Sequence, residues 1–243
     1  MPSNPIAAVV LVAGMGTRMR SDLHKVLHPI AGQAMLVHLL ASVRTLKPER
    51  QVVVAGARRE QVETAVAALN VTVVTQEPQL GTGHAVLQAK DALSGFDGDV
   101  LILYGDVPLV TAATMQRMID RLDADDAPVG VVLGFRPADA LAYGRIIARP
   151  DGVIEKMVEF KDATPQERAV DLCNSGLMAV HSKDLFGLLA RVGNDNAAGE
   201  YYLPDIVMLA ADDGRPSAVI GTDAVEVTGV NSRAELGALG AGW

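Results

Sequence analysis

The sequence predicts an α/β protein with a mixed, mostly parallel sheet and helices on both of its faces. Short apolar, β-branched runs alternate with amphipathic segments through the first 106 residues. The composition is 49% hydrophobic but only 4% aromatic, so the core must consist mainly of Val, Leu, Ile and Ala, which is typical of parallel sheets. With 243 residues, the chain is long enough for one large domain, and we expect residues 1–243 to form it.

The first half is predicted to be a doubly wound array. Residues 6–12 form an apolar run between Pro5 and Gly14, which is typical of a strand buried on both faces. Helices and strands are then expected in turn: helix 34–46, strand 51–55, helix 60–70, strand 71–75, helix 83–93 and strand 99–106. In such sheets a ligand binds beyond the carboxyl ends of the strands.

The second half is less regular. A strand is expected at 130–135, and residues 144–159 contain turn residues between two extended stretches, which predicts a hairpin. Further strand and helix candidates follow at 172–180, 182–192, 203–213 and 224–230. No long Gly/Ser-rich or Pro-rich linker separates the halves, so we expect two lobes of one domain, about 1–110 and about 111–230.

The charge balance argues against binding of nucleic acid. The chain has 21 basic and 29 acidic side chains and a net charge of −8, so a polyanion would meet an unfavourable overall field. A small phosphorylated ligand needs only a local basic pocket. The acidic run at 123–126 is predicted to be a solvated turn rather than a metal cluster.

Cysteine, histidine and hydropathy patterns indicate the compartment. Cys173 is the only cysteine, which excludes an intramolecular disulfide and a multi-cysteine zinc site and suggests a reducing compartment. The five histidines show no close ligand spacing, so a zinc or histidine-nucleophile mechanism is not expected. The amino terminus has no basic n-region, and no apolar run approaches the roughly 20 residues of a membrane span. We therefore expect a cytoplasmic protein without a membrane partner.

The loop after the first strand has the chemistry of a phosphate site. Gly14 and Gly16 permit close approach of the backbone to an anion, and Arg18 and Lys25 add positive charge. Met19 replaces the third glycine of a dinucleotide fingerprint, and the loop lacks the Gly-Lys-Ser/Thr of a Walker motif. From this loop alone, a strand-to-helix turn with solvated basic residues fits equally well.

Two further groups of residues follow predicted strands. Asp106 comes directly after the strand at 99–106, where a carboxylate either caps the next turn or serves as an oxygen ligand for magnesium. Gln76 can both donate and accept, so its amide can recognise the edge of a pyrimidine, and the glycines beside Thr82 allow close approach. An ordinary loop without a ligand is the alternative.

Several motifs in order resemble one family. LVAGMGTRM with Lys25 downstream, QLGTGHA, YGDVPL, YGRI, VEFKDAT, CNSG, GEYYLPDI and VTGVN resemble the pyrophosphorylase domain of bacterial bifunctional N-acetylglucosamine-1-phosphate uridyltransferases. The resemblance covers residues 6 to about 235. It implies a Rossmann-like nucleotidyltransferase fold, of the nucleotide-diphospho-sugar transferase type, with a smaller sugar-binding lobe.

The resemblance implies an enzyme that makes UDP-N-acetylglucosamine and pyrophosphate from UTP and N-acetylglucosamine 1-phosphate, for peptidoglycan and lipopolysaccharide precursors. Arg18 and Lys25 would be catalytic and contact phosphates, and Asp106 with Asn231 would hold Mg²⁺. The implied uridine and phosphate site comprises Leu11, Ala13, Gly14, Gln76, Gly81 and Thr82, with Tyr104 and Gly105 at the centre. The N-acetylglucosamine moiety would be surrounded by Gly144, Glu159, Asn174 and Tyr202.

The sequence also departs from the family pattern. Phe160 stands where histidine is common, and Pro204 where threonine is frequent, so the contacts at the sugar end are less secure. The family continues through a helical arm, which residues 231–243 would begin, into a β-helix that transfers acetyl groups and forms trimers. Without it we expect no acetyl transfer and a monomer or weak oligomer. Other pairs, such as UTP with glucose 1-phosphate or dTTP with a hexose 1-phosphate, remain alternatives, as does a catalytically silent nucleotide-binding module.

Overall fold

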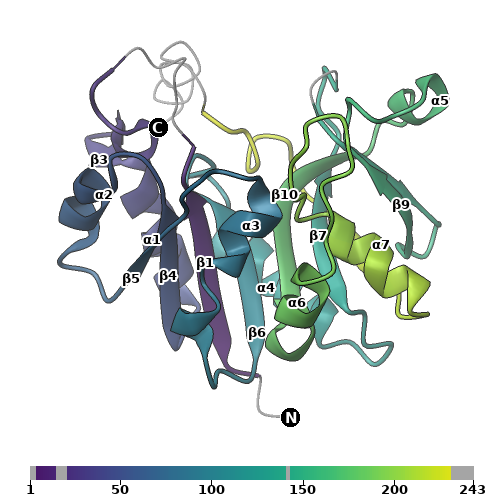
Figure 1. Cartoon of the computed structure of the whole chain (residues 1–243), viewed down its shortest axis with the longest axis horizontal. Coiled ribbons are helices and arrows are strands. Elements are labelled where there is room, and N and C mark those ends of the chain that lie inside the picture. The colour runs from purple at the N-terminus through teal and green to yellow at the C-terminus, as the bar shows by residue number, and fades with distance from the viewer. Residues whose placement is uncertain (1–3, 15–20, 141–142, 231–243) are drawn as a thin grey trace.

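The computed structural model describes residues 4–14, 21–140 and 143–230, and a nine-stranded sheet runs through them (Figure 1). Its first half is parallel. β1 (Ile6–Val12) lies between β4 (Arg50–Ala55) and β6 (Asp99–Tyr104), and β5 (Thr72–Thr75) pairs with β4 at the edge. The parallel order places the carboxyl ends of these strands at one edge of the sheet, as the sequence predicts.

The second half of the sheet is mixed. β10 (Cys173–His181) is antiparallel to both β6 and β7 (Gly130–Phe135), and β11 (Ala218–Gly221) is parallel to β7. The expected hairpin consists of β8 (Arg145–Ala148) and β9 (Ile154–Val158), and β8 also pairs with β10. Because β10 pairs with β6, the sheet continues across the lobe boundary expected near residue 110.

Helices cover both faces of the sheet, because every strand of the parallel half is apolar on both sides. On β1, Ala8 and Val10 face one hydrophobic cluster, whereas Ala7 and Val9 face the other. The first cluster contains side chains of α1 (Met35–Thr45), α2 (Arg59–Val66) and α4 (Ala112–Leu122). The second contains side chains of α3 (Thr82–Leu87), α6 (Ser182–Leu189) and α7 (Asp205–Asp212). This arrangement confirms the predicted fold class.

Three elements differ from the sequence prediction. The helix expected at 83–93 is α3 followed by a separate 3-10 helix, η3 (Asp91–Leu93), because amides after Leu87 bond to carbonyls three residues back. The candidate element at 224–230 is wrong: those residues contain a turn, and the last strand is instead β11. Helix α4 was not predicted, although its buried residues recur at helical spacing.

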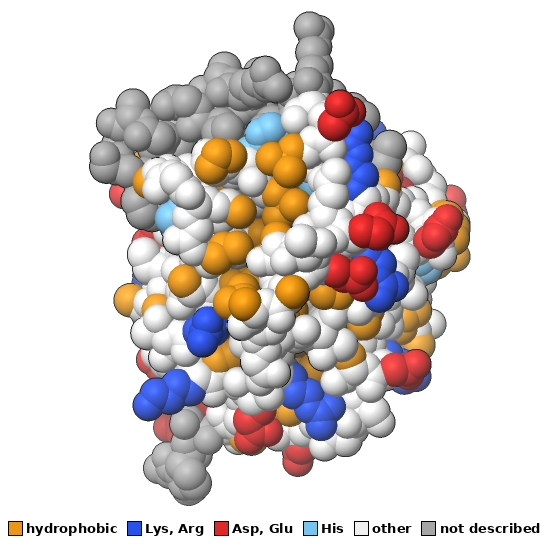
Figure 2. All heavy atoms as spheres, turned by 90° about the vertical axis from the view of Figure 1, so that its left-hand side faces the viewer, with side chains coloured by type: hydrophobic (Ala, Val, Ile, Leu, Met, Phe, Trp, Pro, Cys, Tyr) orange, Lys and Arg blue, Asp and Glu red, His pale blue; other side chains and the backbone are white. Residues whose placement is uncertain are grey.

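The remaining elements are short. They are β2 (Pro29–Ile30), β3 (Gln33–Ala34), the 3-10 helix η2 (Lys25–Leu27) and α5 (Pro165–Arg168). Figure 2 shows the molecule from the side of α2 and β5, where hydrophobic side chains gather on the upper and central part of the face and charged ones lie mainly below and to the right. Among the helices described, none has the length and apolar character that crossing a bilayer requires.

Candidate active site

A cavity of about 290 Å³ lies at the carboxyl ends of the parallel strands, and we call it the Lys25 cavity. Sequence-predicted residues supply most of its wall: Leu11, Ala13, Gly14, Lys25, Gln76, Gly81, Thr82, Tyr104 and Asp106. Gly105 does not line it; the Gly105 amide donates to the Leu11 carbonyl at 3.0 Å and thereby continues the pairing of β6 with β1. Arg18 and Asn231 lie outside the described residues.

Lys25 and Asp106 form an ion pair in this cavity. Lys25 begins η2, and Asp106 lies just beyond β6, so the two side chains approach from elements far apart in the sequence. Their exposed fractions are only 13% and 19%, which limits screening by water. A cation and a carboxylate are thus held together where a charged ligand can reach both.

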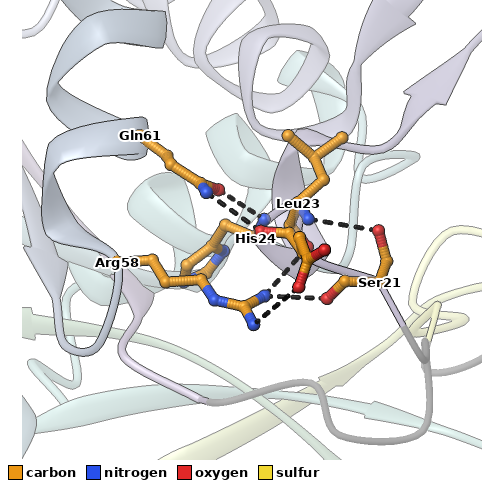
Figure 3. A network of polar contacts seen from close by, with 6 residues as sticks. Ser21, Leu23, His24, Arg58 and Gln61 are labelled. Atoms are coloured by element: carbon orange, nitrogen blue, oxygen red, sulfur yellow. Dashed lines mark hydrogen bonds and ion pairs between the residues drawn. The ribbon is translucent and has the colours of Figure 1, made fainter.

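The segment before Lys25 is fastened to the start of α2 (Figure 3). Gln61 accepts a hydrogen bond from the His24 amide at 2.7 Å and donates to the Asp22 carbonyl at 2.9 Å. Arg58 donates to the Ser21 carbonyl at 2.8 Å. His24 then caps η2, where its ring accepts a hydrogen bond from the Val26 amide, and burial lowers its pKa, which favours the neutral ring. These contacts set the position from which Lys25 enters the cavity.

The end of the described chain returns to Asp106. The Val230 amide donates to the Asp106 carbonyl at 2.9 Å, and the Val230 side chain packs with Ile30 and Met35 in a small buried cluster. The residue preceding Asn231 therefore lies at the Asp106 backbone.

Gln76 is buried and its amide is oriented by neighbouring groups. It follows β5, and its backbone N–H donates to the Ala55 carbonyl at 2.7 Å. Its side-chain nitrogen donates to the Gly81 carbonyl at 2.9 Å and lies 3.1 Å from His84 Nδ1. Because these partners occupy the nitrogen, the carbonyl oxygen is the end of the amide available as an acceptor.

One wall of the Lys25 cavity joins residues that are distant in the sequence. The Tyr201 amide donates to the Leu80 carbonyl at 2.8 Å, and the Leu203 amide donates to Thr82 Oγ1 at 2.9 Å. Gly81 has a φ of +107°, and a Cβ there would lie 2.7 Å from the Tyr201 carbonyl oxygen, so no other residue fits. We call residues 80–83 and 200–203 the closing wall.

Tyr104 lies at the end of β6, between the two halves of the site. Burial raises its pKa above the usual range, a hydrogen bond to Thr82 opposes the rise, and the nearby Glu159 and Asp106 carboxylates add to it. The hydroxyl is therefore neutral at physiological pH and can donate a hydrogen bond.

A second cavity, of about 340 Å³, lies beside the hairpin, and we call it the Glu159 cavity. All four residues expected around the sugar line it: Gly144, Glu159, Asn174 and Tyr202. The closing wall connects the two cavities, because its residue Glu200 lines the first and its residue Tyr202 lines the second.

Local geometry fixes Glu159 and Asn174. A Cβ at Gly144 would lie 3.2 Å from both carboxylate oxygens of Glu159, so a larger residue would displace this side chain. The backbone N–H of Asn174 donates to the Gly144 carbonyl at 2.9 Å, and its side-chain Oδ1 accepts from the backbone N–H of Gly176 at 2.8 Å. The latter bond lies at an irregularity in the β10 pairing, and it leaves the Asn174 side-chain nitrogen as the group able to donate.

The Glu159 cavity is acidic. Burial raises the pKa of Glu159, and the Asp205, Asp162 and Glu200 carboxylates raise it further. Burial also raises the pKa of Asp205, with a further contribution from Asp162. A ligand here meets hydrogen-bond acceptors and negative potential.

The only basic side chain in the lining of the Glu159 cavity, among the residues that the structure describes, is Arg145. It is 2% exposed, donates to the carbonyls of Tyr143 and Arg168, and lies over the Phe160 ring at 5.7 Å. Phe160, where the family commonly has histidine, thus packs against structural arginines rather than entering the lining.

Sequence reasoning missed several lining residues. Gln79 lines the Lys25 cavity and donates to the Ala13 carbonyl, and Glu200 lies nearby. Both belong to motifs that were already noted, QEPQLGTG and GEYY, which was the available signal. Asp162, Asp195 and Asp205 line the Glu159 cavity; the first and last belong to the noted motifs VEFKDAT and GEYYLPDI, whereas Asp195 lies in none of them.

The fold is similar to that of solved nucleotide-transferring enzymes. A solved UDP-glucose pyrophosphorylase complexed with UDP-glucose has a TM-score of 0.77 at 16% identity, with 98% of each chain covered. The inositol-1-phosphate CTP transferase from T. maritima gives 0.72 at 16% identity, covering 99% of this chain and 97% of the other. At these identities the likeness shows the fold.

The family follows from the sequence comparison. Residues 8–199 match the MobA-like NTP transferase domain, and the chain belongs to this family. It is 67% identical over 243 residues to the bifunctional protein GlmU of Rhizorhabdus wittichii, and 64% identical over 241 residues to that of Sphingopyxis alaskensis. These alignments cover 100% and 99% of this chain but 54% and 53% of the relatives, so the chain spans about half of their length. The resemblance stated from the motifs is thereby confirmed.

Proposed function

We propose that this protein transfers a uridylyl group from UTP to N-acetylglucosamine 1-phosphate and releases pyrophosphate. One observation carries the proposal: a cavity containing a lysine and an oriented glutamine adjoins an acidic cavity with amide and hydroxyl groups. A nucleotide and a sugar phosphate can lie in them side by side. The similarity to GlmU proteins supports this pair of substrates.

The base is recognised by Gln76. Its nitrogen already donates to the Gly81 carbonyl, so its oxygen is the free end of the amide. The N–H at ring position 3 of uracil can donate a hydrogen bond to such an oxygen. The nitrogen at the same position of cytosine is an acceptor and cannot. This geometry favours uracil or thymine over cytosine.

The sugar is held in the Glu159 cavity. Glu159 supplies acceptors for sugar hydroxyls, and the Asn174 side-chain nitrogen can donate to the carbonyl of an acetamido group. The acidic lining disfavours a phosphate, so the sugar 1-phosphate orients its phosphate toward the Lys25 cavity. The two reacting groups therefore meet near Tyr104.

The chemical step is an in-line displacement. A phosphate oxygen of the sugar 1-phosphate forms a bond to the α-phosphorus of UTP, and the bond from that phosphorus to the bridging oxygen of pyrophosphate breaks. The nucleophile is already an anion, so no general base is needed. The protein contributes orientation and positive charge: Lys25, together with Arg18, would neutralise the phosphates.

Asp106 and Asn231 would hold Mg²⁺, which would neutralise phosphate charge and orient the polyphosphate. The site has suitable chemistry, because the Asp106 carboxylate lines the cavity and the Val230 amide binds the Asp106 carbonyl, which brings the chain before Asn231 to the same point. Lys25 would exchange part of its pairing with Asp106 for phosphate oxygens when substrate binds.

We further propose that residues 1–243 act as one domain in the cytoplasm, as a monomer or weak oligomer. The unbroken sheet and the buried, free Cys173 support the first two parts of this proposal.

A pyrophosphate-release assay tests the proposal. The protein is supplied with Mg²⁺ and each of UTP, dTTP, CTP and ATP, combined with N-acetylglucosamine 1-phosphate, glucosamine 1-phosphate or glucose 1-phosphate. We expect the highest kcat/KM with UTP and N-acetylglucosamine 1-phosphate. A preference for glucose 1-phosphate would reject the sugar assignment, and no release with any pair would reject the enzymatic function.

A further inference from the structure

Three ligand-type side chains meet at the edge of the sheet opposite the candidate active site. Asp99 is the first residue of β6, and His181, the last residue of β10, is its partner in the antiparallel register. Asp123 follows α4 as its C-cap residue. One ligand atom from each lies within 4.8 Å of the other two, and we call this group the Asp99 cluster.

Asp99 is the unusual member of the cluster. It is 0% exposed, and among the residues that the structure describes neither carboxylate oxygen has a hydrogen-bond partner. His181 Nδ1 lies 2.6 Å from Oδ1, but the two do not have the geometry of a hydrogen bond. Oδ1 thus has an ion-pair contact with His181 and Oδ2 has no hydrogen-bond partner among the described residues, so a further partner would stabilise this buried carboxylate.

The other members leave the cluster accessible on one side. His181 is 17% exposed at its side chain, and Asp123 is exposed. Asp123 Oδ1 accepts a hydrogen bond from Asn4 at 2.9 Å. The cluster thus places two carboxylates beside one imidazole, and a metal ion between them would compensate the carboxylate charges.

We propose that Asp99, Asp123 and His181 bind a divalent transition-metal ion of the zinc class. Two carboxylates and one imidazole form a donor set that suits such ions, whereas Mg²⁺ prefers oxygen ligands and water. Three protein ligands leave a position for water on the exposed side. Bonds of about 2.1 Å place two ligands of one ion about 3 to 4.2 Å apart, so Asp123, on the exposed side, would move slightly inward.

The cluster is separate from the catalytic machinery. Asp99 and Tyr104 are the two ends of β6, which at about 3.3 Å per residue puts roughly 17 Å between them. A bound ion would link β6, β10 and the end of α4, and it would stabilise the folded chain by mass action. The proposal does not depend on the proposed function.

Metal binding to the whole chain is the test. Metal-free protein is titrated with Co²⁺, followed by visible absorption, and with Zn²⁺, followed by calorimetry and the thermal midpoint. We expect one equivalent to bind, with a higher midpoint, in the wild type and in Asp106→Asn, which removes the carboxylate of the candidate active site. His181→Gln and Asp123→Asn should each lower the affinity at least tenfold.

Asp120→Asn is the matched control, because Asp120 is an exposed acid on α4 outside the cluster and its loss should leave binding unchanged. Circular dichroism checks that each variant is folded. If His181→Gln does not fold, Asp123→Asn alone tests the loss of a ligand. Absence of binding to the wild type at millimolar metal would overturn the proposal. Unchanged binding in folded His181→Gln or Asp123→Asn would also overturn it.

Discussion

The Lys25 cavity and the Glu159 cavity adjoin at the same edge of the sheet but are built from different elements. The first lies where parallel strands end in loops, and Lys25 supplies a cation there. The second lies beside the β8–β9 hairpin and the irregular part of β10, and carboxylates line it. On the proposed function, the parallel half would hold the nucleotide, and the antiparallel half would select the second substrate.

The two cavities differ in how their charges are arranged. Both proposed substrates are anions, and the Lys25 cavity offers a partly exposed lysine beside Asp106 and Glu200, whereas the one basic side chain described in the lining of the Glu159 cavity, Arg145, is buried and bonded to backbone carbonyls. The acidic Glu159 cavity repels a phosphate but accepts hydroxyl donors. On the proposed function, this arrangement would direct the phosphate of the sugar 1-phosphate toward Lys25, and variants of each cavity should have separable kinetic effects.

The largest effect is expected from Lys25→Met. Loss of the cation removes compensation of phosphate charge, so kcat should fall by about 10² to 10³ while the fold is kept. Pyrophosphate release at saturating substrates measures it, with Lys90→Met, an exposed lysine, as the control. A kcat within threefold of wild type would show that Lys25 is not catalytic.

Gln76→Glu should have the next largest effect. The carboxylate cannot donate to the Gly81 carbonyl, which leaves unfavourable contacts worth about 1–3 kcal/mol. We therefore expect kcat/KM for UTP to fall roughly 5- to 150-fold, with little change in KM for the sugar phosphate. Steady-state kinetics with each substrate varied separates the two values. An equal loss for both substrates would contradict a role in base recognition.

Asn174→Asp addresses the other cavity. The aspartate keeps the acceptor for the Gly176 amide but loses the side-chain N–H donor, so the strand irregularity should persist. We expect KM for N-acetylglucosamine 1-phosphate to rise roughly tenfold and KM for UTP to stay unchanged. The comparison with glucose 1-phosphate, which has no acetamido group, is the control. A similar loss with both sugars would mean that Asn174 does not contact that group.

The smallest effect concerns the pH dependence of stability. Because the folded protein raises the pKa of Glu159, its contribution to stability is present below the ordinary carboxyl pKa and is lost as pH rises through the raised value. The side chain of the Glu159→Gln variant does not ionise. The thermal midpoint of this variant minus that of the wild type should therefore increase as pH rises through this range. Glu155→Gln, at an exposed position of β9, should show no such gain. A constant difference across pH would contradict the raised pKa.

The fold was largely predictable from the sequence, because long apolar runs dominate the parallel half. The prediction for β1 matches in both bounds, since Pro5 and Gly14 flank one uninterrupted apolar run. Residues 224–230 alternate apolar and polar residues like a strand, but Glu226 accepts a local hydrogen bond from Thr222 and long-range ones from Thr111. The short β11 is recognised only through its pairing with β7.

The candidate site was predictable to a different degree in its two parts. Most of the Lys25 cavity comes from loops after consecutive strands, where sequence position indicates spatial position. The acidity of the Glu159 cavity arises because Asp162, Asp195 and Asp205 converge from separate segments. Asp123 and His181 also come from separate segments. Neither the predicted turn at 123–126 nor the spacing of the histidines indicated that these two side chains lie close to Asp99.

The closing wall also has a consequence for how the chain is made. Translation delivers Gln76 and Gly81 long before Tyr201 and Leu203, so a nascent chain that ends before the wall is complete has an open Lys25 cavity. Until residues 173–181 emerge, one side of β6 also lacks its partner strand. A complete Lys25 cavity therefore forms only after residues 200–203 have emerged, and dividing the gene near codon 150 should yield two fragments that must associate to complete it.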